Sequence, residues 1–250
     1  MTTILVTGGT GTLGRLVTER LRAAGHDVRV LSRRSQPYAV DLREGTGPLA
    51  EAVTGVDTIV HCASSPRGGD ERAARHLIDA AHRAGVRHLV YISIVGVDRV
   101  PLGYYRTKLA VEKLIEESGI GWTVLRTTQF HEFVLEFLER AGKLPVMLLP
   151  AGLSDQPIEV GEVADRLVEL ANGPAPAGRV PDMGGPEVRT LPELARAYLR
   201  VSGRRRPLLN LPLAGKVYRG FRDGGHLTPE RAVGEVTFEQ YLAGRSRPRA

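Results

Sequence analysis

The stretch ILVTGGTGTLG, residues 4–14, decides the fold of this chain. Its first three residues are apolar, as is typical of a strand buried on both faces of a parallel sheet. Gly8, Gly11 and Gly14 follow at intervals of three, and a helical repeat of apolar residues begins behind them and runs up to Gly25. The glycines let the backbone approach a pyrophosphate closely, and the N–H groups and dipole of the helix start face its charge. The stretch therefore predicts a dinucleotide-binding turn.

Length and composition indicate an ordinary soluble globule. The chain has 250 residues, of which 42% are apolar and 25% charged, enough for one large α/β domain with or without a small appendage. No apolar run approaches the roughly 18 residues that span a bilayer, and the first strand leaves no room for a signal peptide. Cys62 is the single cysteine, so no internal disulfide can form. We expect a cytoplasmic protein without a membrane partner.

The net charge of +6 raises the question of a nucleic-acid partner. The basic residues are mostly arginines spread along the chain, and no helix-turn-helix, zinc-finger or aromatic RNA-binding pattern accompanies them. We interpret most of them as solvated surface and predict no nucleic-acid partner. A basic cofactor pocket would use a few of these charges.

Strands and helices alternate through the first part of the chain. Apolar, β-rich runs predict strands, and helical periodicity predicts helices between them. The strands are expected at 28–31, 38–42, 58–62, 88–92 and 122–125, and the helices at 49–54, 70–84 and 104–118. This alternation predicts an α/β fold, a doubly wound parallel sheet of the Rossmann type, with residues 1–150 as the dinucleotide-binding domain.

The pattern changes beyond about residue 145, where loops become rich in proline and glycine. Helices are expected at 161–171, at 194–199 behind a Thr190/Glu193 capping box, and at 213–221, with a short strand at 208–211. We interpret residues 151–250 as a small C-terminal cap that completes a substrate site within the same structural unit.

The end of the second strand carries the choice of cofactor. A site for NAD typically has an acid there for the ribose 2′-hydroxyl, but this chain has Ser32, Arg33 and Arg34, and Asp27 lies on the wrong side of the strand. Two guanidinium groups and a hydroxyl suit a 2′-phosphate, so NADP(H) is favoured over NAD(H). The alternative is that both arginines are only solvated.

Further cofactor contacts follow the other strands. Asp41, with Leu42, is available to an adenine amine or a backbone N–H, and the small side chains at the end of the strand at 58–62 let a cofactor pass close to the backbone. The expected cofactor-binding residues outside the second strand end are Gly8, Thr10, Gly11, Thr12, Leu13, Gly14, Asp41, Leu42, Cys62, Ala63 and Ser64. No metal site is predicted.

Tyr104 and Lys108 lie four residues apart at the start of a helix and so share a face. A cation beside a phenol lowers its pKa and makes it a usable proton donor or acceptor near neutrality. Ser93, at the carboxyl end of the preceding strand, could hold a substrate carbonyl oxygen. The three are the candidate catalytic residues.

These motifs together resemble the short-chain dehydrogenase/reductase superfamily, in its atypical NAD(P)-binding, NmrA-like branch. The resemblance covers nearly the whole chain through TGGTGTLG at 7–14, SRR at 32–34, DL at 41–42, YIS at 91–93, YYRTKLAVE at 104–112, WTVLRTTQF at 122–130 and GGPEVRTLPELA at 184–195. It implies that Tyr104 is the acid/base, that Lys108 also binds the nicotinamide ribose, and that Ser93 orients the substrate. Tyr105 could be the phenol that faces the cofactor instead, although it breaks the Tyr-x-x-x-Lys register.

Two classes of function remain open at this point. The first is an NADP(H)-dependent oxidoreductase, a reductase or dehydrogenase that acts on a carbonyl or enone of a small molecule, as a monomer or homodimer. The second is an NADP-binding sensor or regulatory protein without turnover, and isomerase or dehydratase chemistry on the same fold is a lesser alternative. Because a sheet strand ends just before them, Gln129, Phe130 and His131 are the candidate substrate contacts, opposite part of 208–226.

Overall fold

The computed structural model describes residues 1–65, 68–174 and 178–246. The chain forms two compact units whose segments interleave. The first comprises Met1–Ser93, Gly103–Arg126 and Gly161–Pro181, and the second comprises Ile94–Leu102, Thr127–Val160 and Asp182–Ala250. The expected division was a single boundary near residue 150, whereas the chain passes between the two units several times.

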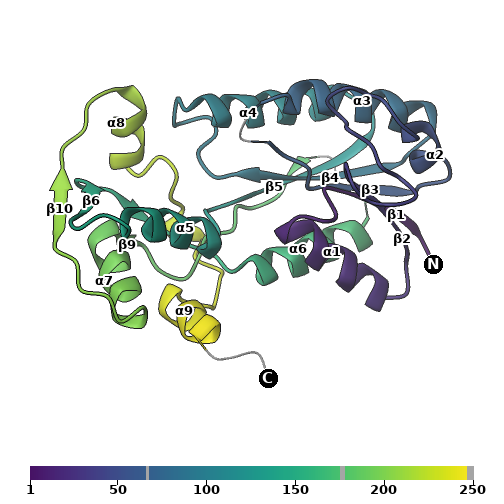
Figure 1. Cartoon of the computed structure of the whole chain (residues 1–250). Coiled ribbons are helices and arrows are strands. Elements are labelled where there is room, and N and C mark those ends of the chain that lie inside the picture. Colours follow the sequence, from purple (N-terminus) through teal and green to yellow (C-terminus); the bar gives the residue numbers. More distant parts are fainter. Residues whose placement is uncertain (66–67, 175–177, 247–250) are drawn as a thin grey trace. The chain divides into compact units, whose positions relative to one another are not determined.

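A six-stranded sheet forms the centre of the first unit (Figure 1). Its strand order is β2-β1-β3-β4-β5-β8, and the pairs β1–β2, β1–β3, β3–β4 and β5–β8 are parallel. The strands are β1 (Thr3–Thr7), β2 (Asp27–Leu31), β3 (Thr58–His61), β4 (His88–Ile94), β5 (Gly121–Thr127) and β8 (Gly178–Arg179). The order reverses at β1, because β2 lies on one side of it and β3 to β5 on the other. This is the doubly wound arrangement that the alternation of strands and helices predicts, and ligands of such sheets bind at the reversal, beyond the carboxyl ends of the strands.

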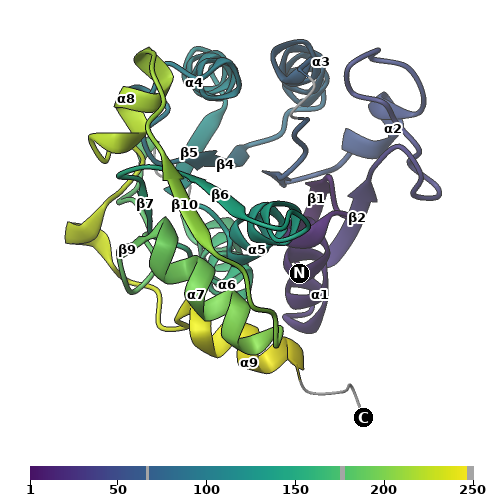
Figure 2. The ribbon, with the colours of Figure 1, turned by 60° about the vertical axis from the view of Figure 1, so that its left-hand side comes forward.

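Helices cover both faces of this sheet. In Figures 1 and 2, α2 (Leu49–Val53), α3 (Asp70–Arg83) and α4 (Gly103–Glu116) lie over one face, and α1 (Thr12–Ala23) and α6 (Val160–Asn172) over the other. Successive side chains of β1 point to opposite faces of the sheet, and both sets are buried. Leu5 packs in the core under α2 to α4, and the flanking Ile4 and Val6 are also fully buried. Burial on both faces explains why the strand is a continuous apolar run rather than an alternating one.

A buried ion pair ties α4 to β5. Arg126 donates from its Nε and from a terminal nitrogen to the two carboxylate oxygens of Glu112, at 2.9 and 2.6 Å. Both side chains are almost inaccessible to solvent, so the bidentate geometry is needed to offset the cost of removing two charges from water. The pair fixes the helix that also carries Tyr104 and Lys108.

The second unit has its own core of helices packed on a short strand pair. Strands β6 and β10 are parallel, and β7 and β9 are antiparallel. Apolar side chains of α5, α7 and α9 pack together with those of β6. The elements are α5 (His131–Ala141), β6 (Met147–Pro150), β7 (Ser154–Asp155), β9 (Arg189–Thr190), α7 (Leu191–Val201), β10 (Leu208–Leu211), α8 (Lys216–Arg222), the 3₁₀ helix η1 (Pro229–Arg231) and α9 (Phe238–Ser246).

Two sequence-based expectations are wrong. The segment at 38–42 is not a regular strand, because it takes part only in two isolated bridges, Ala39 with Ser32 and Asp41 with Thr46. The helix expected at 213–221 begins only at Lys216, because Gly215 before it has a left-handed φ of 112°. The other expected elements are present within about two residues, apart from helix 194–199, which extends to Leu191–Val201 behind the capping box of Thr190 and Glu193.

Within the part of the chain that the structure describes, none of the helices combines the length and apolar character that a membrane crossing requires.

Candidate functional site

The glycine-rich turn between β1 and α1 is packed so closely that two of its positions admit no side chain. Gly8 has a φ of 67°, and a Cβ there would lie 2.8 Å from the Cα and N atoms of Ala63, just beyond β3. A Cβ on Gly14 would lie 2.3 Å from the carbonyl oxygen of Gly8. These contacts bring the start of α1 against the ends of β1 and β3, which is where a bound phosphate would need backbone N–H groups.

The start of α1 carries no cap of its own. Gly11, the residue before the helix, has extended backbone and offers no side chain, and the first turn holds no acidic residue. Among the described residues, the backbone N–H groups of Thr12, Leu13 and Gly14 have no hydrogen-bond acceptor, and Arg15 is the first to bond back, to Gly11. Free N–H groups and the positive end of a helix dipole suit an anion.

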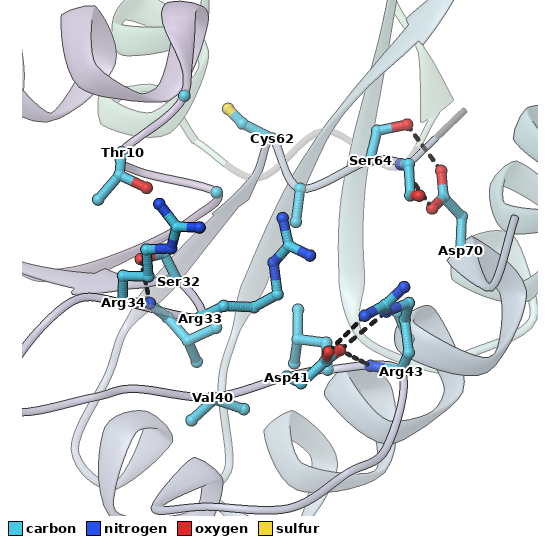
Figure 3. Close-up of a pocket in the computed structure, with 17 residues that line it drawn as sticks. Thr10, Ser32, Arg33, Arg34, Val40, Asp41, Arg43, Cys62, Ser64 and Asp70 are labelled. Atoms are coloured by element: carbon cyan, nitrogen blue, oxygen red, sulfur yellow. Dashed lines mark hydrogen bonds and ion pairs between the residues drawn. The ribbon is translucent and has the colours of Figure 1, made fainter. Parts of the chain in front are cut away.

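A pocket of about 670 Å³ opens at this turn (Figure 3). Its walls come from the glycine turn, the end of β2, the segment at 40–43, the end of β3 and the start of α3. The lining residues are Gly8, Thr10, Gly11, Leu31, Ser32, Arg33, Arg34, Val40, Asp41, Leu42, Arg43, Cys62, Ala63, Ser64, Ser65, Asp70 and Ala73. All of them belong to the first unit, and the volume is in the range of pockets that hold a cofactor.

Two arginines of the pocket have no acidic partner among the described residues. The guanidinium groups of Arg33 and Arg34 point into the pocket on the side of Thr10 and Cys62 (Figure 3), and neither is in an ion pair there. The Ser32 hydroxyl holds the turn that presents them, because its oxygen accepts hydrogen bonds from the backbone N–H of Arg34 at 3.2 Å and of Ser35 at 3.0 Å. Two free cations beside a serine hydroxyl are suited to bind a phosphate.

Arg43, in contrast, is held by Asp41. Its Nε and a terminal nitrogen donate to the two oxygens of Asp41 at 3.0 and 2.6 Å. This hydrogen bonding, reinforced by the charges of Arg43 and Arg33, lowers the pKa of Asp41 to about 2, so the carboxylate is ionised at neutral pH. The predicted contact of Asp41 with an adenine amine stays a prediction.

Tyr104 reaches the rim of this pocket. Its hydroxyl lies 2.8 Å from the Oγ of Ser64, and Ser64 in turn donates to the carboxylate of Asp70 at 2.6 Å. Burial raises the pKa of Tyr104, and the charge of Asp70 raises it further. The expectation that Lys108 lowers the pKa of this phenol is therefore wrong.

Lys108 is directed at the sheet. Its Nζ donates to the carbonyl oxygen of Ile92 at 2.7 Å and lies 4.4 Å from the centre of the Tyr91 ring. Burial lowers the pKa of Lys108 to about 8, although Asp70, Cys62 and Glu112 oppose the shift. The ammonium group thus has one carbonyl and one aromatic face as neighbours, and its predicted role toward a ribose stays a prediction.

The remaining catalytic candidates are buried. Ser93 is 1% exposed, and its Oγ has no hydrogen-bond partner among the described residues. Tyr105 is also 1% exposed, whereas Tyr104 is half-buried and bonded to a pocket residue, so Tyr104 is the phenol at the pocket. Cys62 lines the pocket as a neutral thiol, because burial raises its pKa to about 12.

The three candidate substrate contacts lie in the second unit. Gln129 and Phe130 are half-buried, and the carbonyl of Gln129 accepts from the backbone N–H of Ile158. His131 is fully buried: its Nε2 lies 3.0 Å from the carbonyl oxygen of Val236, and its ring stacks on Tyr241. Burial lowers the pKa of His131 to about 4, so the ring is neutral and forms part of the core. Substrate binding by Gln129 and Phe130 stays a prediction.

Two charged residues of the pocket were not anticipated from the sequence. Arg43 forms an i,i+2 pair with Asp41 within a turn, a spacing that carries no periodic signal. Asp70 begins α3 and was interpreted only as the first residue of a helix. A polar residue at the start of the helix that follows a buried strand is a signal for ligand contact in a parallel sheet, and it could have identified Asp70.

The residues of the pocket fit a dinucleotide phosphate. Free N–H groups at α1 suit a pyrophosphate, and Arg33 and Arg34 suit an additional phosphate, while the close packing of Gly8 and Gly14 leaves the space in front of the turn open.

Comparison with known protein families gives the same result. The model of a family described as NAD(P)H-binding matches residues 8–174. The chain belongs to this family. Two relatives are a (4-alkanoyl-5-oxo-2,5-dihydrofuran-3-yl)methyl phosphate reductase of Streptomyces griseus, 33% identical over 80% of this chain and 74% of that protein, and quinone oxidoreductase 2 of Escherichia coli, 29% identical over 83% and 77%.

Solved structures share the fold. An NADPH-dependent quinone oxidoreductase from E. coli, determined in complex with NADPH, has a TM-score of 0.81 at 23% identity and covers 98% of this chain and all of that one. A nucleoside-diphosphate-sugar epimerase from Staphylococcus aureus has a TM-score of 0.78 at 19% identity, covering 97% and 99%. The predictions of a Rossmann fold and of an NAD(P)-binding oxidoreductase family are confirmed.

The buried Lys108 gives a prediction for stability against pH. Its pKa is lowered from 10.5 to about 8, so between these values the unfolded chain binds more protons than the folded one and folding stability rises with pH. The free energy of unfolding of the wild type, minus that of Lys108→Met, should therefore increase by about 3 kcal/mol from pH 8 to pH 10.5. Denaturant unfolding at several pH values measures it. Lys113→Met, at an exposed position of α4, is the control, and its difference from the wild type should not change with pH. If the difference in the free energy of unfolding for Lys108→Met is equally independent of pH, the lowered pKa of Lys108 is contradicted.

Proposed function

We propose that this protein is an NADPH-dependent reductase of small molecules that contain a conjugated carbonyl group, such as a quinone or an enone. The two relatives support the substrate class, since one is named as a reductase of an oxo-dihydrofuran and the other as a quinone oxidoreductase. The cofactor is supported by the pocket itself.

The observation that carries the proposal is the pair of unpartnered guanidinium groups of Arg33 and Arg34. A ribose 2′-hydroxyl needs an acceptor at this place, whereas a 2′-phosphate needs cations. The nearest acid, Asp41, is already engaged by Arg43. The charge balance of this wall therefore favours NADP(H) over NAD(H).

Several residues of the site would bind the cofactor or supply a proton in such a reaction. NADPH, when bound, would supply a hydride from its nicotinamide to the substrate. The N–H groups at the start of α1 and the arginines bind the phosphates, which fixes the cofactor in the pocket. Tyr104, held at the pocket rim by Ser64, carries its proton at neutral pH, as an ordinary phenol does, and is the group that would donate a proton to a substrate oxygen. Turnover distinguishes this proposal from a sensor that only binds the cofactor.

The cofactor preference is testable by calorimetry. NADPH should bind more tightly than NADH, and Arg33→Glu should weaken NADPH binding about tenfold or more while it leaves NADH binding almost unchanged, because a charge-assisted contact of about 1.5–3 kcal/mol is lost. Arg75→Glu, at an exposed position of α3 outside the pocket, makes the same charge change and should have little effect. Equal affinities of the wild type for both cofactors would refute the preference.

The role of Tyr104 is testable by turnover. With NADPH and a panel of quinones and enones, loss of NADPH absorbance measures the rate. Tyr104→Phe should lower kcat about 10²–10⁴-fold and leave NADPH affinity nearly intact, because it removes a proton donor but no phosphate contact. Tyr105→Phe, which changes the buried neighbour, is the matched control and should keep most of the activity. If Tyr105→Phe abolishes turnover and Tyr104→Phe does not, the assignment of the phenol is wrong.

A further inference from the structure

A chain of hydrogen bonds links Tyr104 to an acidic residue that the proposed reaction does not otherwise use. The Tyr104 hydroxyl lies 2.8 Å from the Oγ of Ser64, and this Oγ donates to Oδ2 of Asp70 at 2.6 Å. The three residues come from α4, from the segment after β3 and from the first turn of α3, all within the first unit. Figure 3 shows Ser64 and Asp70 directed at one another at the edge of the pocket.

The direction of the hydrogens follows from the chemistry of the groups. A serine hydroxyl has one hydrogen, and that of Ser64 is given to the Asp70 carboxylate, which can only accept when ionised. The Ser64 oxygen therefore receives the hydrogen of Tyr104. A tyrosinate at this place would find no donor among the described residues unless Ser64 turned away from Asp70.

Asp70 is itself held in place. Its Oδ1 accepts from the backbone N–H of Ser65 at 2.8 Å, so each oxygen has a partner, and the side chain is 5% exposed. A carboxylate in the first turn of α3 is favoured by the helix dipole. The Asp70 carboxylate, at the end of this chain of hydrogen bonds, is therefore held in one position, unlike an acid on the surface.

The other charged and titratable groups around Tyr104 do not replace this contact. Tyr91 of β4 interacts electrostatically with Tyr104 and Asp70, and burial raises the pKa of Tyr91 well above the ordinary value, so Tyr91 is neutral. Lys108, on α4 itself, donates to Ile92. Arg43, which interacts electrostatically with Asp70, is paired with Asp41. Glu112, which interacts with Lys108 on α4, is paired with Arg126.

We propose that Asp70, acting through Ser64, is a positioning residue that directs the hydrogen of Tyr104 toward Ser64 and keeps Tyr104 a neutral phenol in the protein without substrate. This inference rests on the proposed function, because it deepens the role given there to Tyr104. Asp70 is not a catalytic residue in this account, since it acts on the phenol through a second hydroxyl.

Titration of Tyr104 in the protein without cofactor or substrate tests the proposal. Tyrosine labelled with ¹³C at Cζ reports phenol ionisation by NMR, and the Tyr104 signal is assigned by its loss in Tyr104→Phe. Asn at position 70 carries no charge, and its amide can donate to Ser64, which frees the Ser64 hydrogen for the Tyr104 oxygen. Asp70→Asn should therefore move the midpoint of the Tyr104 titration to lower pH by roughly one pH unit.

Two further variants make the test specific. Asp79→Asn removes the same charge at an exposed position of α3, and it should leave the midpoint unchanged. In a Ser64→Ala background the effect of Asp70→Asn should shrink, because the bridge is gone; an undiminished effect would show that Asp70 does not act through Ser64. If Asp70→Asn does not fold, Asp70→Ser, a residue suited to a helix start, should shift the midpoint in the same direction.

A midpoint in Asp70→Asn that is unchanged or higher than in the wild type overturns the proposal. The result is separable from the proposed function, because the titration needs neither NADPH nor turnover. As a second readout, the alkaline limb of kcat against pH should move to lower pH in Asp70→Asn; a purely structural defect would not move this limb.

Discussion

The contact between the Gly8 carbonyl and Gly14 sets the geometry on which the site depends. A Cβ at residue 14 would lie 2.3 Å from that oxygen, so α1 can start this close to β1 only because the residue is glycine. The same turn presses Gly8 against Ala63 at the end of β3. Helix N–H groups, the end of β2 and the end of β3 are thereby brought around one pocket, and the order of the sheet reverses at β1 beside them.

Charge then decides what such a pocket can hold. Three arginines line the pocket. Arg43 forms an ion pair with Asp41, whereas Arg33 and Arg34 form no ion pair with any of the described residues. The pocket also contains Asp70, which is bonded to Ser64 and Ser65 and is linked to Tyr104 through Ser64. The pocket thus carries cations at the end of β2 and a hydrogen-bonded carboxylate at the start of α3. This asymmetry fits a phosphorylated dinucleotide better than an uncharged ligand.

The sequence predicts the sheet and the glycine-rich turn between β1 and α1 well, because both depend on local rules. An apolar run, glycines at fixed spacing and helical periodicity are all visible along the chain, and Arg33 and Arg34 follow from their place after a strand. The neighbours of Tyr104 are not visible in this way. The Tyr-x-x-x-Lys spacing places two side chains on one helix face, but burial directs Lys108 to the carbonyl of Ile92, and the phenol finds Ser64 instead, 40 residues away.

Expectations also fail where tertiary packing overrides a plausible pattern. His131 follows a strand and so suits a ligand contact, yet its ring stacks on Tyr241 in the core of the second unit. Helix α5 was not predicted, although Val134, Leu135 and Leu138 have helical spacing and are all buried. A polar residue at a strand end therefore predicts a ligand contact only when it is also known which distant segments pack against it.

The central claim is that the pocket beside Arg33 and Arg34 recognises a 2′-phosphate, and adenosine bisphosphates test it most directly. Calorimetry would compare 2′,5′-ADP with 3′,5′-ADP, which has the same charge but a displaced phosphate, and with 5′-AMP. The account predicts that 2′,5′-ADP binds about tenfold or more tightly than either, as one good charge-assisted contact requires. Equal affinities of 2′,5′-ADP and 3′,5′-ADP would contradict recognition of the 2′-phosphate, because the arginines would then attract anions without discriminating between the 2′ and 3′ positions.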